Sequence, residues 1–303
     1  MSLLVVGSVA LDTIETPFGR SEGALGGSAA FFSAAASFLC PVQLVGVVGA
    51  DFPMEDLAFL ARRGVDLAGL ERVPGESFRW WGQYGNDLNT ARTLETRLGV
   101  FAGFRPRLPE SFRDAAWVFL ANIDPELQLE VLEQVRAPRL VACDTMDFWI
   151  ERKRAALQEL LRQVDLLFIN DAEIRALSGE RNLMRAARWV QARGPALVVI
   201  KKGEHGAALV MPNEVFFTPG FPLEDVFDPT GAGDAFAGGF LGYLARAGSA
   251  DPVYLKRAMV YGSAMGSFAV ERFSLDRFRD LAEGEIHERV QAFREMTAFE
   301  HPL

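Results

Sequence analysis

The stretch FDPTGAGDAFAGG, residues 227–239, places small residues directly before a predicted amphipathic helix over residues 234–247. Asp228-Pro229 is expected to end a preceding strand. The small residues let the backbone approach a ligand, and the first N–H groups of a helix have no partner within the helix. Such a helix start attracts anions. Asp234 therefore sets a proton acceptor beside an anion site.

This pairing of a carboxylate with an anion site suits phosphoryl transfer. That reaction needs a positioned hydroxyl, a group that takes its proton, and donors for the charge on the migrating phosphoryl group. The alternative is that Asp234 only caps its helix. For an isolated G-x-G-D pattern we would prefer that alternative, but the full string with two further glycines favours catalysis.

Short apolar runs alternate with segments of helical length along most of the chain. The runs are continuous rather than alternating, which is typical of parallel strands covered on both faces. Strands are predicted at Leu3–Val6, Val42–Val48, Trp117–Ala121, Leu140–Ala142, Leu166–Ile169 and Leu197–Ile200. Helices are predicted at Ser28–Phe38, Met54–Arg63, Glu126–Val135, Glu151–Gln163 and Leu183–Arg193. The pattern predicts one α/β domain over residues 1–303, a doubly wound, mostly parallel sheet flanked by helices.

Two stretches interrupt this alternation. Leu11–Phe18 follows the first strand without a helix, and Ser77–Val100 mixes aromatic, β-branched and polar residues. Both are predicted to form half-exposed antiparallel strands, either as a lid over a site at the sheet edge or as a surface insertion. Further on, Ser274 is predicted to cap a helix over Leu275–Leu281.

The bulk composition excludes several classes of protein. Among 303 residues the net charge is −9 and the pI about 5.0, which argues against nucleic acid as a partner. Three histidines leave little for a Ser-His-Asp triad or a histidine-rich metal site. Cys40 and Cys143 are interpreted as buried thiols in a reducing compartment. Without a signal peptide or a membrane-length apolar run, we expect a cytoplasmic protein with no membrane partner.

The string at 227–239 closely resembles the second signature of the PfkB carbohydrate kinases, which include ribokinase, fructokinases and adenosine kinase. The resemblance implies a ribokinase-like fold, with ATP as phosphoryl donor and Mg²⁺ as cofactor. It also implies that Asp234 is the catalytic base and that the backbone of Gly231, Ala232 and Gly233 forms an anion hole.

Further motifs in the family's order extend the resemblance over almost the whole chain. The stretch GSVALD at 7–12 resembles the family's first strand, whose closing aspartate, here Asp12, binds substrate hydroxyls. Gly26 and Gly27 resemble the early di-glycine motif that lines the acceptor site, and VGVVGAD at 45–51 resembles the family's G-x-x-G-x-D stretch. Each motif alone could be a turn or a cap, but together they support the family.

The nucleotide side shows two further matches. Asn170 and Glu173 match the N-x-x-E motif, which the family ties to magnesium and phosphate placement, so Glu173 is an indirect Mg²⁺ candidate. Gly203 and Gly206 match the G-x-x-G turn beside the nucleotide phosphates.

Two lysines adjoin that turn and complete the predicted nucleotide site. Lys201 and Lys202 are two of only four lysines in the chain, and one of the pair is expected to face phosphate. We assign Lys202 to the nucleotide site, together with Thr230 from the segment 227–239.

The acceptor region departs from ribokinase. Residues 28–32 read SAAFF where ribokinase has polar residues, so Phe31 would make that wall apolar. In the lid, Trp80, Trp81 and Tyr84 offer aromatic surface, and Asn89 is a polar acceptor-site candidate. The tryptophans would stack on a nucleobase or a ring polyol, or else pack within the lid or against a homodimer partner.

Two other features are open at this point. Asp144 and Asp147 follow a predicted strand on the ligand edge, where they would bind acceptor hydroxyls, assist a metal or simply face solvent. Ribokinase-like members often bind potassium through a C-terminal loop, but the corresponding stretch 269–274 is short here, which leaves monovalent-cation dependence open.

Our leading hypothesis is an ATP-dependent kinase that phosphorylates a hydroxyl of a sugar or sugar-like polyol. A nucleoside kinase of the same fold is the alternative, and a nucleotide-binding protein without catalysis is a distant one. A dinucleotide-dependent oxidoreductase is disfavoured, because the first strand lacks the G-x-G-x-x-G that should follow it. The sequence leaves open the acceptor, a donor other than ATP, and the oligomeric state.

Overall fold

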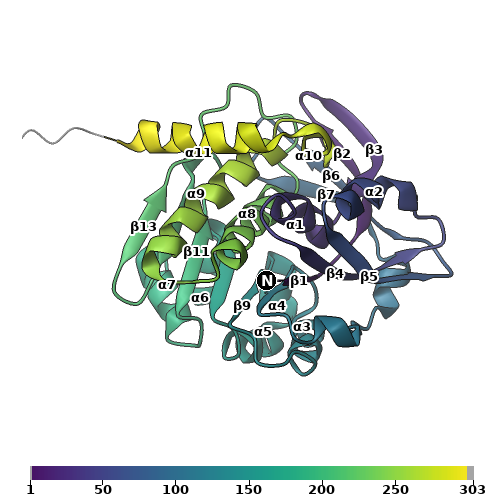
Figure 1. The fold of residues 1–303 in the computed structure, drawn as a ribbon, viewed down its shortest axis with the longest axis horizontal. Helices are drawn as coiled ribbons and strands as arrows, with labels where there is room; N and C mark the ends of the chain where they lie inside the picture. The colour runs from purple at the N-terminus through teal and green to yellow at the C-terminus, as the bar shows by residue number, and fades with distance from the viewer. Residues whose placement is uncertain (1, 299–303) are drawn as a thin grey trace, which may run out of the picture.

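The computed structural model describes residues 2–298 and contains two sheets (Figure 1). The larger sheet has nine strands in the order β13-β12-β11-β10-β9-β8-β1-β4-β5. Its strands are β1 (Leu3–Val6), β4 (Val42–Gly49), β5 (Val65–Val73), β8 (Trp117–Leu120), β9 (Leu140–Cys143), β10 (Leu166–Asn170), β11 (Leu197–Lys201), β12 (Ala207–Val210) and β13 (Val215–Thr218). The strands from β11 through β10, β9, β8, β1 and β4 to β5 all run parallel to one another. Strands β12 and β13 are antiparallel additions at one edge. The predicted fold class is confirmed.

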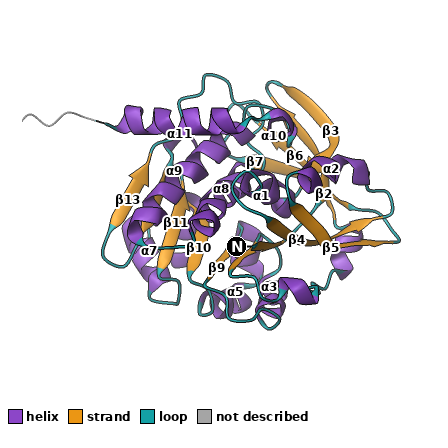
Figure 2. Cartoon of the chain, viewed as in Figure 1, coloured by secondary structure: helices purple, strands orange, loops and turns teal. Residues whose placement is uncertain are grey.

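Helices cover both faces of this sheet (Figure 2). They are α1 (Ser28–Ala36), α2 (Ala58–Arg62), α3 (Pro125–Leu132), α4 (Asp147–Arg152), α5 (Arg154–Leu161), α6 (Asp171–Ser178), α7 (Leu183–Gln191), α8 (Ala232–Ala247), α9 (Pro252–Ala269), α10 (Asp276–Asp280) and α11 (Glu283–Thr297). In β1, Leu3 and Val5 belong to the hydrophobic core that includes α1, α8 and α9, whereas Leu4 and Val6 belong to the core that includes α3, α5, α6 and α7. A strand buried on both faces needs a continuous apolar run, which explains why these strands were visible in the sequence.

The segments predicted as a lid or a surface insertion form the smaller sheet, which we call the lid, with strands in the order β3-β2-β6-β7. The segments that interrupt the alternation supply β2 (Ala10–Thr16), β6 (Phe78–Tyr84) and β7 (Ala91–Arg97). The predicted antiparallel pairing is wrong at the centre, because β2 and β6 run parallel. Sequence reasoning also missed β3 (Gly19–Gly26), a strand rich in glycine and charge that lies at the edge of the lid.

Three local predictions need correction. The helix expected over Glu151–Gln163 is two helices that meet at Lys153. Ser274 is not a helix cap: α10 starts at Asp276, and Ser274 has φ 57° with its amide turned to Asp228. No strand directly precedes Asp228-Pro229, because β13 ends at Thr218 and a loop follows.

Across the described residues 2–298, no helix combines the length and the apolar character that crossing a membrane would require.

Candidate active site

Three polar residues lie where neighbouring parallel strands end. Asp144 follows β9, Asn170 closes β10 and Lys201 closes β11, so all three lie at the carboxyl edge where open α/β sheets place ligands. Lys201 Nζ lies 2.7 Å from Asp144 Oδ2, and both side chains are largely buried. Burial alone would lower the pKa of Lys201, but Asp144, Glu173 and Asp234 outweigh it and raise that pKa. The lysine is therefore a fixed cation facing several carboxylates.

Asp234 lies in the first turn of α8, beside this ion pair. Its side chain stays partly accessible, unlike that of Asp144. Burial of the carboxyl group and the nearby Asp144 charge raise the pKa of Asp234 to about 7, and Lys201 opposes the shift. A carboxylate with a pKa near the working pH is well matched to take and release a proton.

The residues that lead into α8, up to Gly233, form a tight loop whose shape depends on glycine. Gly231 precedes the helix with φ 73°, and a Cβ there would lie 2.2 Å from the Phe31 ring. Phe31 is 1% exposed, so its ring packs against this loop and does not line an open wall of the acceptor site. A Cβ on Gly233 would lie 2.9 Å from Lys201 Nζ, which places that glycine beside the cation. Ala232 is the first residue of α8, so the amides of this loop lie at the helix N-terminus.

Asp228, which sequence reasoning did not assign to the site, fixes this loop. It is fully buried, Oδ1 accepts the Thr230 N–H at 2.9 Å, and Oδ2 accepts the Ser274 N–H at 2.8 Å. The Asp-x-Thr turn was the available signal, since aspartate often accepts the amide two residues on.

The acceptor-side residue Asp12 is buried at 4% exposure on β2. The N–H groups of Gly27 and Trp80 donate to its carboxylate, yet Oδ1 has no hydrogen-bond partner among the described residues. Burial and the Asp228 charge raise the pKa of Asp12 to about 7. A Cβ on Gly26 would lie 1.9 Å from Asp12 Oδ2, so glycine lets the carboxylate sit here. An unpartnered buried oxygen in this position suits a substrate hydroxyl.

The inner face of the lid carries Trp80, Gly82 and Tyr84, on the same side as Asp12 by strand register. The Trp80 indole lies against Gly82, where an added Cβ would be 2.0 Å from the ring, and Trp80 Nε1 donates to Thr93 at 3.2 Å. The lid therefore presents the rings of Trp80 and Tyr84 on the face that it shares with Asp12.

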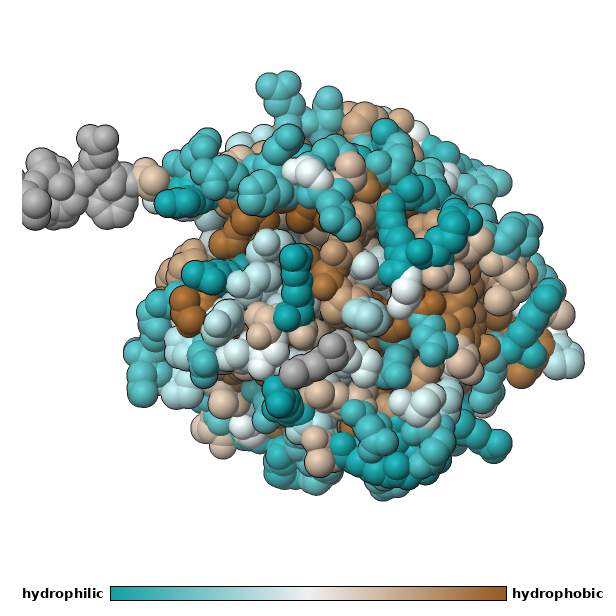
Figure 3. Space-filling view, in the orientation of Figure 1, coloured by the Kyte–Doolittle hydropathy of each residue, from teal (hydrophilic) through white to brown (hydrophobic). Residues whose placement is uncertain are grey.

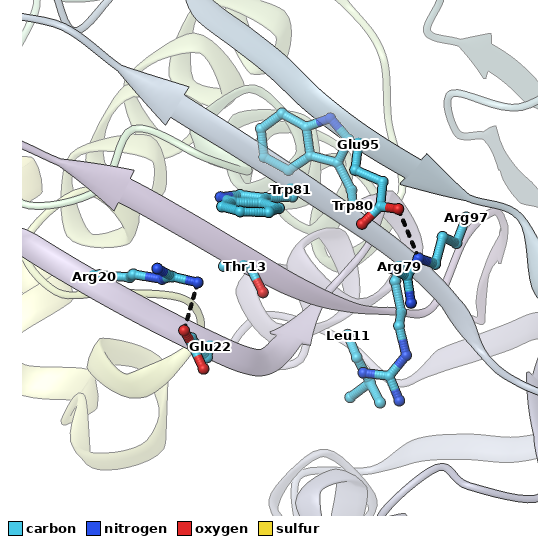
Figure 4. Close-up of a pocket in the computed structure, with 9 residues that line it drawn as sticks. All are labelled: Leu11, Thr13, Arg20, Glu22, Arg79, Trp80, Trp81, Glu95 and Arg97. Atoms are coloured by element: carbon cyan, nitrogen blue, oxygen red, sulfur yellow. Dashed lines mark hydrogen bonds and ion pairs between the residues drawn. The ribbon is translucent and has the colours of Figure 1, made fainter.

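The outer face of the lid carries the second tryptophan. Arg20 lies 5.1 Å from the Trp81 ring centroid, and Arg97 pairs with Glu95 nearby (Figure 4). Trp81 therefore packs within the lid, as one of the alternatives held.

Asn89, predicted for the acceptor, lies at the lid tip against Gly203, where a Cβ would come within 2.1 Å of its Oδ1. That contact places it next to the predicted nucleotide turn. In this turn Gly203 and Gly206 both have positive φ, and the Lys202 N–H donates to the Gly206 carbonyl at 2.8 Å. Lys201, not Lys202, is the lysine that the structure brings to Asp144 and Asp234.

Asn170 and Glu173 form a reciprocal cap at the start of α6. Asn170 Oδ1 accepts the Glu173 N–H at 2.8 Å, and Glu173 Oε2 accepts the Asn170 N–H at 2.9 Å. Burial raises the pKa of Glu173 to about 7, and Lys201 opposes the shift. Within residues 2–298 no group of three or more His, Cys, Asp or Glu side chains could hold a metal ion. A magnesium ion bound with the nucleotide would be held largely by phosphate oxygens and water, as is usual for this ion.

The C-terminal loop, where the resemblance to the family would place a monovalent cation, is held by hydrogen bonds within the protein. The Val270 carbonyl accepts the Phe227 N–H at 2.9 Å, Asp228 Oδ2 accepts the Ser274 N–H, and the Ser274 hydroxyl donates to a carbonyl of β3. A cation needs several oxygen atoms that converge and are free to coordinate it. Here hydrogen bonds within the protein already engage these oxygens.

An apolar groove of about 650 Å³ lies between β13, α9 and α11, where Figure 3 shows brown surface beneath α11. The rings of Tyr243 and Tyr261 stack at 4.5 Å along one wall, and Phe216 lies on another. Tyr243 is nine residues beyond Asp234 on α8, which corresponds to about 14 Å along the helix.

Comparison with known proteins agrees with this geometry. The model of the pfkB family carbohydrate kinases matches residues 3–278. A cytidine kinase of Thermococcus kodakarensis is 34% identical over 256 residues, covering 81% of this chain and 89% of that protein. Two solved structures share the fold: a ribokinase II of E. coli with ATP and Mg²⁺ (TM-score 0.79, 21% identity, 96% and 99% covered) and a Burkholderia thailandensis nucleoside kinase with inosine (0.78, 20%, 96% and 97%).

The family match and the kinase relatives therefore define a phosphotransferase that acts on a hydroxyl of a sugar or nucleoside. The chain belongs to the pfkB family of carbohydrate kinases.

Proposed function

We propose that this protein is an ATP-dependent nucleoside kinase in which Asp234 is the catalytic base. The observation that carries the proposal is a carboxylate with a pKa near 7, at a helix N-terminus, beside the Lys201–Asp144 pair. Asp234 takes the acceptor hydroxyl proton while that oxygen forms a bond to the γ-phosphorus. The bond from the γ-phosphorus to the β–γ bridging oxygen breaks, and ADP leaves with that electron pair.

The loop before α8 would hold the charge of the transferring group. The amides of Gly231, Ala232 and Gly233 lie at the positive end of the helix, and Lys201 adds a full charge beside Gly233. Magnesium, when bound with the nucleotide, neutralises phosphate charge. Lys201 also shields Asp234 from the Asp144 charge, which keeps the base ionised more of the time.

A nucleoside acceptor is favoured over a free sugar by the inner face of the lid. Asp12 offers its unpartnered oxygen to ribose hydroxyls, and Trp80 pairs with it across the strands. A planar base has a face that can stack on indole, which a small polyol lacks. The similarity to a cytidine kinase supports the same choice. A sugar acceptor, our first hypothesis from sequence, becomes the alternative.

An acceptor panel tests this choice. With ATP and Mg²⁺, we expect kcat/KM for cytidine, uridine, adenosine or inosine to exceed that for ribose and fructose. Trp80→Ala should lower kcat/KM for the preferred nucleoside about tenfold to a hundredfold, because base–aromatic stacking contributes about 1–3 kcal/mol. Trp189→Ala on α7, where the ring stacks on Arg193 away from the lid, is the matched control. Turnover restricted to free sugars would reject the nucleoside assignment.

We also propose that the base of ATP lies in the aromatic groove. From Asp234, α8 runs toward Tyr243 over about 14 Å, a span comparable to that of an extended nucleoside triphosphate. Tyr261→Ala should raise the KM for ATP about tenfold and leave the KM for the acceptor within about twofold, because it removes one stacking ring. Tyr254→Ala, on the same helix outside the groove, is the control. An unchanged KM for ATP would place the base elsewhere.

Turnover should not depend on potassium. Because hydrogen bonds already engage the oxygens around Asp228, exchanging K⁺ for tetramethylammonium at constant ionic strength should change kcat by less than about twofold. The measurement is initial rate against K⁺ concentration at saturating ATP and acceptor. Activation of tenfold or more by K⁺ would show that this loop does accept a cation.

A further inference from the structure

The lid touches the anion-hole loop through one hydrogen bond between distant parts of the sequence. Tyr84 is the last residue of β6, and its phenol oxygen accepts the Thr230 hydroxyl at 3.1 Å. The two residues are 146 positions apart, and Thr230 directly precedes Gly231. The lid is therefore hydrogen-bonded to the loop that contains Gly231, Ala232 and Gly233, the proposed anion hole.

We propose that Tyr84 is a positioning residue that aligns the anion-hole loop when the lid closes. The inference rests on the proposed function of Asp234 and that loop. Phe31 supports Gly231 from below, and Asp228 holds the Thr230 N–H at 2.9 Å. In this proposal these contacts would persist with the lid open, because they come from the main body, whereas the Tyr84 contact would form only with the lid closed.

The environment of Tyr84 keeps its hydroxyl neutral. Burial raises the pKa of the phenol, and the charges of Asp228 and Asp12 raise it further. A neutral hydroxyl next to two carboxylates can hold the Thr230 hydrogen bond without adding a third negative charge near the migrating phosphoryl group. A tyrosine is thus suited to this place, where an acidic residue would oppose the reaction.

Closure would then couple acceptor binding to chemistry. Asp12 and Tyr84 both belong to the central strand pair of the lid, β2 with β6, so an acceptor held by Asp12 stabilises the closed position of Tyr84. With the lid open, the loop loses this contact, and ATP faces a less ordered anion hole. The arrangement makes transfer to water slower than transfer to the acceptor.

A double-mutant cycle tests the proposal, with Tyr84→Phe and Thr230→Val made singly and together. Each single variant should lower kcat about threefold to tenfold, with the KM for the acceptor within twofold. The double variant should lose no more than the worse single, because both remove the same hydrogen bond. In a Thr230→Ser background, which keeps the hydroxyl, Tyr84→Phe should again lower kcat. The ratio of ATP hydrolysis to acceptor phosphorylation should rise in Tyr84→Phe.

Tyr254→Phe, on α9 away from the lid, is the control for loss of a phenol hydroxyl. The positioning role would be overturned if the kcat losses of the two single variants multiplied in the double variant. It would also be overturned if the variants changed only the melting temperature and left kcat and the hydrolysis ratio unchanged. The two proposals fail separately. Normal turnover in Asp234→Asn would refute the base whatever the cycle shows, whereas multiplying effects with an inactive Asp234→Asn would refute only the role of Tyr84.

Discussion

Replacing Asp234 with asparagine should lower kcat by at least about a hundredfold, because the amide cannot take the proton of the acceptor hydroxyl. ATP should still bind with a Kd within about twofold, since the anion-hole amides and Lys201 remain. The melting temperature should not fall. A carboxylate whose pKa is raised to about 7 is less stable when ionised in the folded protein than in water, and asparagine carries no charge.

The experiment combines steady-state turnover with ATP binding by calorimetry and with thermal unfolding. Asp225→Asn, at an exposed position in the loop before α8, is the matched control and should keep normal turnover. Near-normal kcat in Asp234→Asn would remove the base from the mechanism. Loss of both turnover and folding would contradict the expected stability, and Asp234→Ser, which is small and uncharged, would then separate the two effects.

Replacing Lys201 with methionine should lower the free energy of unfolding by about 3–5 kcal/mol at pH 8. The change leaves Asp144, which is 3% exposed, as an unpaired buried carboxylate beside Glu173 and Asp234. Turnover should fall as well, because the pKa of Asp234 rises further once its nearest cation is lost. Denaturant unfolding and the pH dependence of kcat measure the two effects.

The adjacent lysine provides the control for that stability measurement. Lys202→Met, on a partly exposed side chain, should change the free energy of unfolding by less than about 0.5 kcal/mol. Adding Asp144→Leu to Lys201→Met should recover more than half of the lost stability, because it removes the unpaired charge. If Lys201→Met lowers the free energy of unfolding by less than about 1 kcal/mol, the ion pair does not stabilise the fold, and another group compensates the Asp144 charge.

The larger sheet could be predicted because each parallel strand is a continuous apolar run. The lid pairing could not. Strand β3 reads GRSEGALG, which carries no strand pattern, and the parallel contact of β2 with β6 joins segments separated by more than 60 residues. Propensity describes local sequence, whereas this pairing depends on where the main sheet places each segment.

Within the site, the motif residues were predictable but their partners were not. Choosing between Lys201 and Lys202 requires the register of β11, because successive side chains of a strand point to opposite faces. Asp228 looked like a turn residue before proline, and its second bond, to the Ser274 amide 46 positions away, could not be predicted from the local sequence. Gln128 carried no signal at all, yet its buried amide donates to the carbonyls of Leu120, Ala121 and Asp144.

The parallel contact between β2 and β6 also has a consequence for protein engineering. The lid consists of two hairpins, residues 10–26 and 78–97, whose strands pair with each other through β2 and β6, and the acceptor-side residues Asp12 and Trp80 lie one on each. A substrate preference carried by the lid cannot be moved between relatives as a single cassette. Chimeras must exchange both hairpins together, and a library that varies one alone will mostly sample mismatched halves.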